Sequence, residues 1–183
     1  MDSQNKEFND FSIPEDSSNS FVSEAIKDVF QKELTEVEEF KKVNDELLAG
    51  ADNPKDELTN IVVGYIQAMG DVDQVNVCSY DNGSGVALDG WAFNGDEDMT
   101  SIDLFLTIYI EPEKSQNLTA SEIDRHFNWL TRFYEQSVNG KMLGKIDDNK
   151  SDLYQVADLI HSTEKIDRLR LFMMTNAIAP PNY

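Results

Sequence analysis

Hydrophobic and polar residues alternate along three neighbouring stretches in the middle of the chain. These stretches lie within residues 75–110 and are separated by an Asn/Gly-rich turn at 82–85 and an acidic turn at 94–98. A period of two residues is typical of half-buried strands, and Asn-Gly is a strong hairpin signal. The pattern therefore predicts a three-stranded antiparallel meander over 75–81, 86–94 and 101–110.

Helical patterns flank the predicted meander. Apolar residues at three- and four-residue spacing predict a helix over 56–69, closed by Gly70. Thr119 with Glu122 forms a capping-box pattern that opens a second helix, and Ser151 caps a third. The apolar run over 165–177 predicts a further, buried strand. The predicted fold class is α/β (α+β), with at least four strands in a mixed sheet flanked by helices.

Two aspartates fall on neighbouring strands of the meander. The two-residue period places Asp89 on one strand face with Trp91, and Asp103 on a strand face with Phe105. A lone ionised carboxylate among large apolar side chains is costly unless a partner neutralises it. Asp89 and Asp103 are therefore candidate site residues. The alternative is that both are ordinary strand residues in ion pairs, since structural ion pairs resemble functional sites.

The chain divides into three parts by composition. Residues 1–19 are polar and acidic, and we expect a flexible lead-in there. Residues 20–54 carry an apolar stripe at helical spacing and predict an N-terminal helical segment. Residues 55–183 form the predicted α/β domain, and its Pro-rich ending suggests that the natural protein continues into a C-terminal region.

Charge and composition limit the classes of partner. The 183 residues carry a formal net charge of −20, and such a field repels nucleic acid at long range. No basic cluster offers the phosphate contacts that drive nucleic-acid affinity. The N-terminus lacks a signal peptide's apolar core, and no apolar run reaches membrane-spanning length. We therefore expect a cytoplasmic protein without a membrane partner.

The remaining chemistry-bearing residues give weak signals. Cys78 is the only cysteine and is interpreted as a small buried hydrophobe. His126 and His161 stand apart in the sequence, so we interpret them as surface or boundary side chains rather than metal ligands. We interpret Trp91 and Trp129 as core residues rather than stacking platforms.

The order helix, three-strand meander, helix, helix, strand is that of a restriction-endonuclease-like core. The chain also resembles the N-terminal domain of the abortive-infection phage-resistance (AIPR) family over roughly residues 55–177. The resemblance rests on five features in order: a helix ending in Gly70, the strand LDGWAF at 88–93, the following acidic turn and strand SIDLF, the helix YQVADLI, and a strand ending in Thr-Asn. It implies a PD-(D/E)XK-like fold within a larger phage-defence protein.

In active members of that wider fold, carboxylates on two strands bind Mg²⁺ and position a water. The resemblance places Asp89 and Asp103 as the metal ligands, with Glu57, or its neighbour Asp56, as a carboxylate from the helix. Catalytic roles for Asp89, Asp103 and Glu57 follow from the same resemblance. Mg²⁺ is accordingly the implied cofactor.

The sequence departs from the active pattern at one position. In the active pattern, a lysine stands two residues after the second carboxylate. Here that carboxylate is Asp103, and Phe105 occupies the lysine position. The basic residues between 58 and 140 are Lys114, Arg125 and Arg132. The two arginines are the suggested replacements, and arginine transfers protons poorly. The departure places catalysis in question.

Three functional hypotheses remain. The first is a degenerate nuclease-like module that acts in interaction or sensing, with a protein partner or its own C-terminal region. The second is an active metal-dependent nuclease, which contacts nucleic acid through the full-length protein. The third is an acidic nucleic-acid mimic that inhibits a DNA-binding partner. The missing lysine and the acidic charge favour the first.

Overall fold

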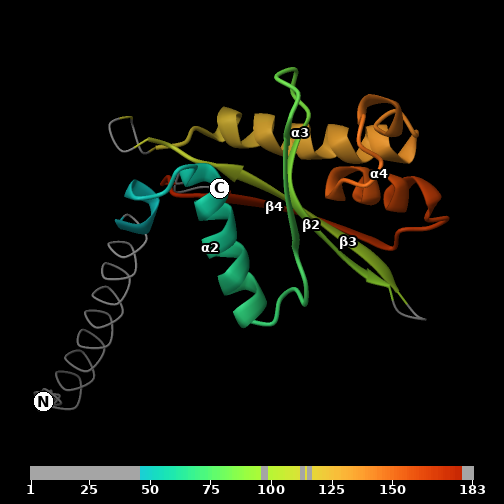
Figure 1. Cartoon of the computed structure of the whole chain (residues 1–183), viewed down its shortest axis with the longest axis horizontal. Helices are drawn as coiled ribbons and strands as arrows, with labels where there is room; N and C mark the ends of the chain where they lie inside the picture. Colours follow the sequence, from blue (N-terminus) through green and yellow to red (C-terminus); the bar gives the residue numbers. More distant parts are fainter. Residues whose placement is uncertain (1–45, 96–98, 112–113, 115–116, 179–183) are drawn as a thin grey trace, which may run out of the picture. The chain divides into compact units, whose positions relative to one another are not determined.

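Strand pairing in the computed structural model gives one four-stranded sheet in the order β1-β2-β3-β4 (Figure 1). The structure describes residues 46–95, 99–111, 114 and 117–178, which belong to the compact unit Asn44–Tyr183. Strands β1 to β3 form an antiparallel meander, and β4 lies parallel to β3. The strands are β1 (Asn76–Asp81), β2 (Ala87–Gly95), β3 (Thr100–Ile108) and β4 (Arg168–Thr175).

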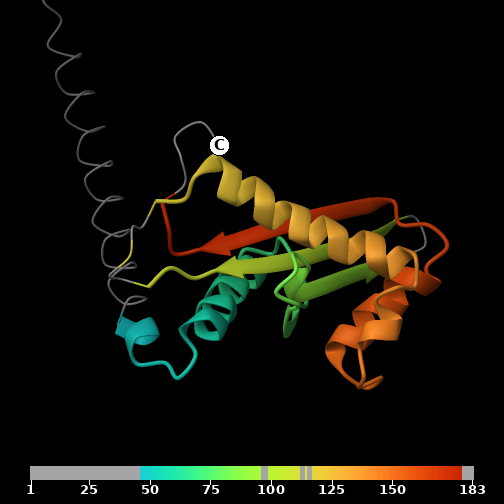
Figure 2. The same cartoon turned by 90° about the horizontal axis from the view of Figure 1, so that it is seen from above.

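In the part of the chain from residue 54 to 178, the described α-helices and one 3-10 turn lie around this sheet. They are α2 (Pro54–Ala68), α3 (Ala120–Val138), η1 (Leu143–Lys145) and α4 (Asp152–Ser162). Figure 2 shows the long helix α3 running along the sheet. Each α-helix begins at a side-chain cap, as expected for residues that satisfy free N–H groups at a helix start: Asn53, Thr119 and Ser151. In α3 the predicted capping box with Glu122 is present.

The alternation of β3 divides the interior into two cores. Ile102, Leu104 and Leu106 pack with α3 and α4, while Phe105 packs with Val63 of α2. This is the division that the two-residue period predicts for β3. All seven residues 101–107 of β3 are buried, as a central strand covered on both faces requires.

Alternation fails in β2 beside Asp89. Leu88 and Trp91 both pack against the α3/α4 core, although an odd spacing should place them on opposite faces. The β1–β2 register also shifts here, because Val77 pairs with Gly90 and Tyr80 with Leu88. Such bulges redirect side chains. The predicted sharing of one face by Asp89 and Trp91 is therefore wrong: Asp89 reaches α2 instead.

The hydrogen-bonded pairing of β2 with β3 ends before β3 itself ends. We call the gap beside the unpaired end of β3 the notch. Pairing runs from Gly95–Thr100 to Gly90–Phe105, so the last residues of β3 lie beyond it. Near the same end of β2, the turn between β1 and β2 packs over α3. Gly85, at φ +86°, sits where a Cβ would lie 2.8 Å from the Arg132 side chain and 2.9 Å from Trp129 Nε1.

The structure confirms the predicted mixed fold of at least four strands with flanking helices. Among the described residues, no helix combines the length and apolar character needed to cross a membrane. The predicted lead-in 1–19, most of the helical segment 20–54 and the tip of the acidic turn lie outside the described residues. The three-part domain division stays a prediction.

Candidate functional site

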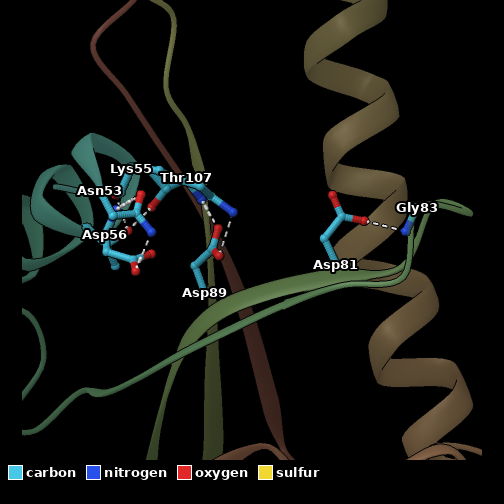
Figure 3. Close-up of polar contacts among 8 residues, drawn as sticks. Asn53, Lys55, Asp56, Asp81, Gly83, Asp89 and Thr107 are labelled. Carbon is cyan, nitrogen blue, oxygen red and sulfur yellow. Dashed lines mark hydrogen bonds and ion pairs between the residues drawn. The ribbon is translucent and has the colours of Figure 1, made fainter.

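Asp89, on β2, is held by two other elements at the notch, α2 and β3. One carboxylate oxygen lies 2.7 Å from Lys55 Nζ, and the other accepts a 2.7 Å hydrogen bond from the backbone N–H of Thr107 (Figure 3). Lys55 lies in the first turn of α2, directly after Pro54, where the cap at Asn53 fixes the helix start. The carboxylate replaces the β2 backbone as acceptor for β3, which is why the ladder stops here.

Burial and hydrogen-bond partners shift the pKa of the Asp89 carboxylate in opposite directions. Its residue is 2% exposed, and this burial raises its pKa above the usual 3.8. The hydrogen bonds from Lys55 and from Thr107 N–H lower the pKa in part, because both favour the charged form. Lys55 keeps 31% of its side chain exposed, so the ion pair is open to solvent on the lysine side only.

Two buried hydroxyls complete the contact between α2 and β3. Thr59 and Thr107 are hydrogen-bonded at 2.7 Å, and Thr59 Oγ1 donates to the carbonyl of Lys55 at 2.9 Å. Because Thr59 uses its proton on that carbonyl, Thr107 is the donor in the hydroxyl pair. These bonds fix α2 on the sheet and so fix Lys55 over Asp89.

Asp103 forms a separate ion pair with the neighbouring strand. Arg170 Nε and Nη2 contact its two oxygens at 2.7 and 2.6 Å, a bidentate geometry. Asp103 is fully buried, and its carboxylate raises the pKa of Arg170. Arg170 also donates to the Asp71 carbonyl and lies over the Phe172 ring. The pair joins β3, β4 and the chain after α2.

The structure does not bring the two candidate aspartates together. The Asp89 carboxylate contacts β3 at Thr107, four residues from Asp103, which is roughly 13 Å along a strand. A single divalent cation with oxygens at about 2.0–2.6 Å does not bridge such a span. Glu57 lies half-buried on α2, and Asp56 is engaged with the Asn53 cap. Within the described residues, no three His, Cys, Asp or Glu side chains gather around one point.

The donor set at Asp89 does not fit Mg²⁺. Hard divalent cations require several oxygen ligands, usually with more than one carboxylate or with phosphates. Here one carboxylate is already shared between an ammonium and a backbone N–H. The Lys55 ammonium also repels a second cation, so the protein's own side chain supplies the charge that a metal would supply.

Sequence reasoning missed the two residues that neutralise the aspartates. Lys55 is 34 residues from Asp89, and Arg170 is 67 residues from Asp103. The suggested basic options, Arg125 and Arg132, contact neither aspartate in the described structure. One signal was present: a buried carboxylate requires a cation, and this acidic chain has only 15 lysines and arginines in total to supply one.

The chain matches a known protein family. The family described as "Abortive infection phage resistance protein N-terminal domain" matches residues 58–182, about two thirds of the chain. Comparisons with curated proteins and with solved structures gave no match. The matched residues include the whole sheet, α3 and α4, and most of α2, but they begin just after Lys55.

Proposed function

The chain belongs to the abortive infection phage resistance protein N-terminal domain family, and so to phage defence, and we propose that this domain acts there by interaction or sensing rather than by cleaving nucleic acid. The observation that carries the proposal is the Lys55–Asp89 ion pair at 2.7 Å. It gives the candidate site an internal cation in place of a metal-binding group of carboxylates.

The spacing of the ion pairs supports a non-catalytic role. An active metal-dependent nuclease needs a metal, an activated water and groups that stabilise developing charge at one point. Asp89 and Asp103 are each bound to a different cation, and Thr107, where Asp89 contacts β3, lies four residues from Asp103, roughly 13 Å along the strand. Neither position combines the ligands that such chemistry requires.

Charge supports a protein partner over direct nucleic-acid contact. The net charge is −20, and the described basic side chains at the two aspartates are already in ion pairs. Phosphate binding depends on available lysines and arginines. The proposed partner is therefore another protein or the C-terminal region of the parent protein, and nucleic acid would be contacted through the full-length protein.

A cleavage assay tests this proposal. The full chain is incubated with Mg²⁺ or Mn²⁺ and with duplex DNA, single-stranded DNA or RNA, beside Asp89→Asn and a control, Asn128→Ala, at an exposed position of α3. We expect equal, background cleavage by all three proteins. Metal-dependent cleavage that Asp89→Asn abolishes and Asn128→Ala retains would establish an active nuclease and overturn the proposal.

A further inference from the structure

The notch beside Asp89 opens into a cavity of about 280 Å³ that no role described so far uses. It lies between the end of β3, the start of β2, the first turn of α2 and one face of α3. Its polar and aromatic lining comprises Lys55, Asp81, Thr107, Tyr109, His126 and Trp129. Ligand pockets for drug-sized molecules span about 300–1,000 Å³, so this cavity suits a small ligand.

His126 presents a hydrogen-bond acceptor to this cavity. Its Nδ1 lies 2.6 Å from the Glu122 carbonyl oxygen. A carbonyl only accepts hydrogen bonds, so Nδ1 carries the ring proton and Nε2 has the free lone pair. Burial lowers the pKa of His126 below its usual value, which keeps the ring neutral near pH 7. A ligand therefore meets an acceptor at His126.

Hydrogen-bond donors also line the cavity. Lys55 Nζ has three protons, and one of them points to Asp89. Tyr109 follows the last residue of β3 and also lines the cavity, and its phenol O–H is a hydrogen-bond donor. The N–H of Thr107 is not available, because Asp89 accepts its hydrogen bond. A ligand therefore meets donors at Lys55 and Tyr109.

The charges around the cavity favour a neutral ligand. Lys55 is neutralised by Asp89, and Asp81 adds a second carboxylate to the lining. An anionic ligand would meet these carboxylates and the −20 field of the chain. An organic cation would compete with the guanidinium of Arg125, which already lies 5.7 Å from the Trp129 ring centre. Neither charged class is well matched.

Aromatic side chains favour a flat ligand. Trp129 and His126 are three residues apart on α3, share one helix face, and have ring centres 4.6 Å apart. Tyr109 adds a third ring to the lining. Planar heterocycles stack on such surfaces, and nucleobases combine a stacking face with donors and acceptors along one edge.

We propose that this cavity binds a neutral planar heterocycle of the nucleobase or nucleoside type, whose edge bridges His126 Nε2 and the donors at Lys55 and Tyr109 while its face lies on Trp129. The proposal rests on the sensing role proposed above and names the ligand class for it. It differs from nuclease chemistry, because the ligand carries no phosphate and no bond is cleaved.

Tryptophan fluorescence gives a direct test. The chain has two tryptophans, so Trp91→Phe leaves Trp129 as the only indole. Adenosine, guanosine, cytidine and thymidine are titrated into the full-length Trp91→Phe protein, and each 5′-monophosphate is titrated in parallel. We expect saturable quenching by at least one nucleoside, and weaker binding of its monophosphate. Quenching by monophosphates alone, or by none of the eight compounds, would overturn the proposal.

Calorimetry on three variants tests the residues. Trp129→Leu should weaken nucleoside binding by about tenfold, the effect of one lost base–aromatic stack. His126→Phe keeps a ring but removes Nε2, and should also weaken binding. Asn128→Ala, exposed on the same helix, should leave it unchanged. Circular dichroism checks that each variant folds, and unaltered binding by folded Trp129→Leu and His126→Phe would contradict the assignment. A negative result here leaves the outcome of the cleavage assay, which tests the proposed function separately, unaffected.

Discussion

Replacement of Lys55 by methionine tests whether this lysine is the cation that makes buried Asp89 tolerable. Methionine retains most of the apolar stem and removes only the ammonium group. The Asp89 side chain is 3% exposed and keeps one hydrogen bond, from Thr107 N–H. The variant therefore leaves a buried carboxylate without a counter-charge, and the folded state should lose stability.

The expected loss follows from the geometry of the pair. Removal of one partner of a fully buried ion pair costs about 3–5 kcal/mol. Lys55 is about one third exposed and Asp89 retains a backbone donor, so we expect a loss of about 2–3 kcal/mol in the free energy of unfolding. In a double-mutant cycle with Asp89→Asn, the coupling energy should be roughly 1–2 kcal/mol.

The pH dependence of the free energy of unfolding gives a second prediction, with a definite direction. Burial raises the folded-state pKa of Asp89 above 3.8, and loss of Lys55 removes an interaction that lowers it. An acid with a raised folded pKa binds more protons when folded, so its stability contribution is lost as pH rises through that pKa. The deficit of Lys55→Met should therefore be small near pH 4 and largest at pH 8.

Urea unfolding of the full chain, followed by tryptophan fluorescence and by circular dichroism, measures both effects. Lys150→Met, at an exposed position, makes the same change in net charge and serves as the control. A Lys55→Met deficit no larger than that of Lys150→Met at pH 8, or one independent of pH, would refute the reasoning.

Three further substitutions test other parts of the structure. In Arg170→Met, fully buried Asp103 loses both hydrogen bonds from the guanidinium group. The free energy of unfolding in urea should fall by about 3–4 kcal/mol. A loss below about 1 kcal/mol would contradict a stabilising role for this ion pair. Gly85→Ala places a side chain at φ +86° against α3 and should cost about 1–3 kcal/mol; an unchanged melting temperature would argue against this turn geometry. Thr119→Ala removes the α3 cap and should cost about 1 kcal/mol by the same urea assay, whereas Thr119→Ser should be nearly neutral.

The regular elements were predictable from local sequence. The alternation in β3 separates Leu104 from Phe105, and the structure places these residues in different cores. The capping box at Thr119 and Glu122 sets the start of α3 within one residue. Such signals depend on neighbours within a few positions, so a single sequence contains them.

The candidate site was less predictable because it depends on tertiary contacts. The bulge beside Asp89 turns its side chain toward α2, and no local pattern marks that irregularity. Lys55 reaches Asp89 only because α2 packs on β3 through Thr59 and Thr107. The metal role was carried over from the resemblance position by position, and a single sequence does not contain the distance between the two carboxylates.

The most direct test of the central claim is a Mn²⁺ titration of the isotope-labelled full chain followed by nuclear magnetic resonance. A bound paramagnetic ion broadens the amide signals closest to it. We predict that broadening spreads over exposed carboxylates of this acidic protein, and that the signals of Asp89 and Thr107 stay no broader than their surroundings, because Lys55 already supplies the charge. Selective broadening of Asp89 and Thr107 that disappears in Asp89→Asn would show a metal site there and contradict the account.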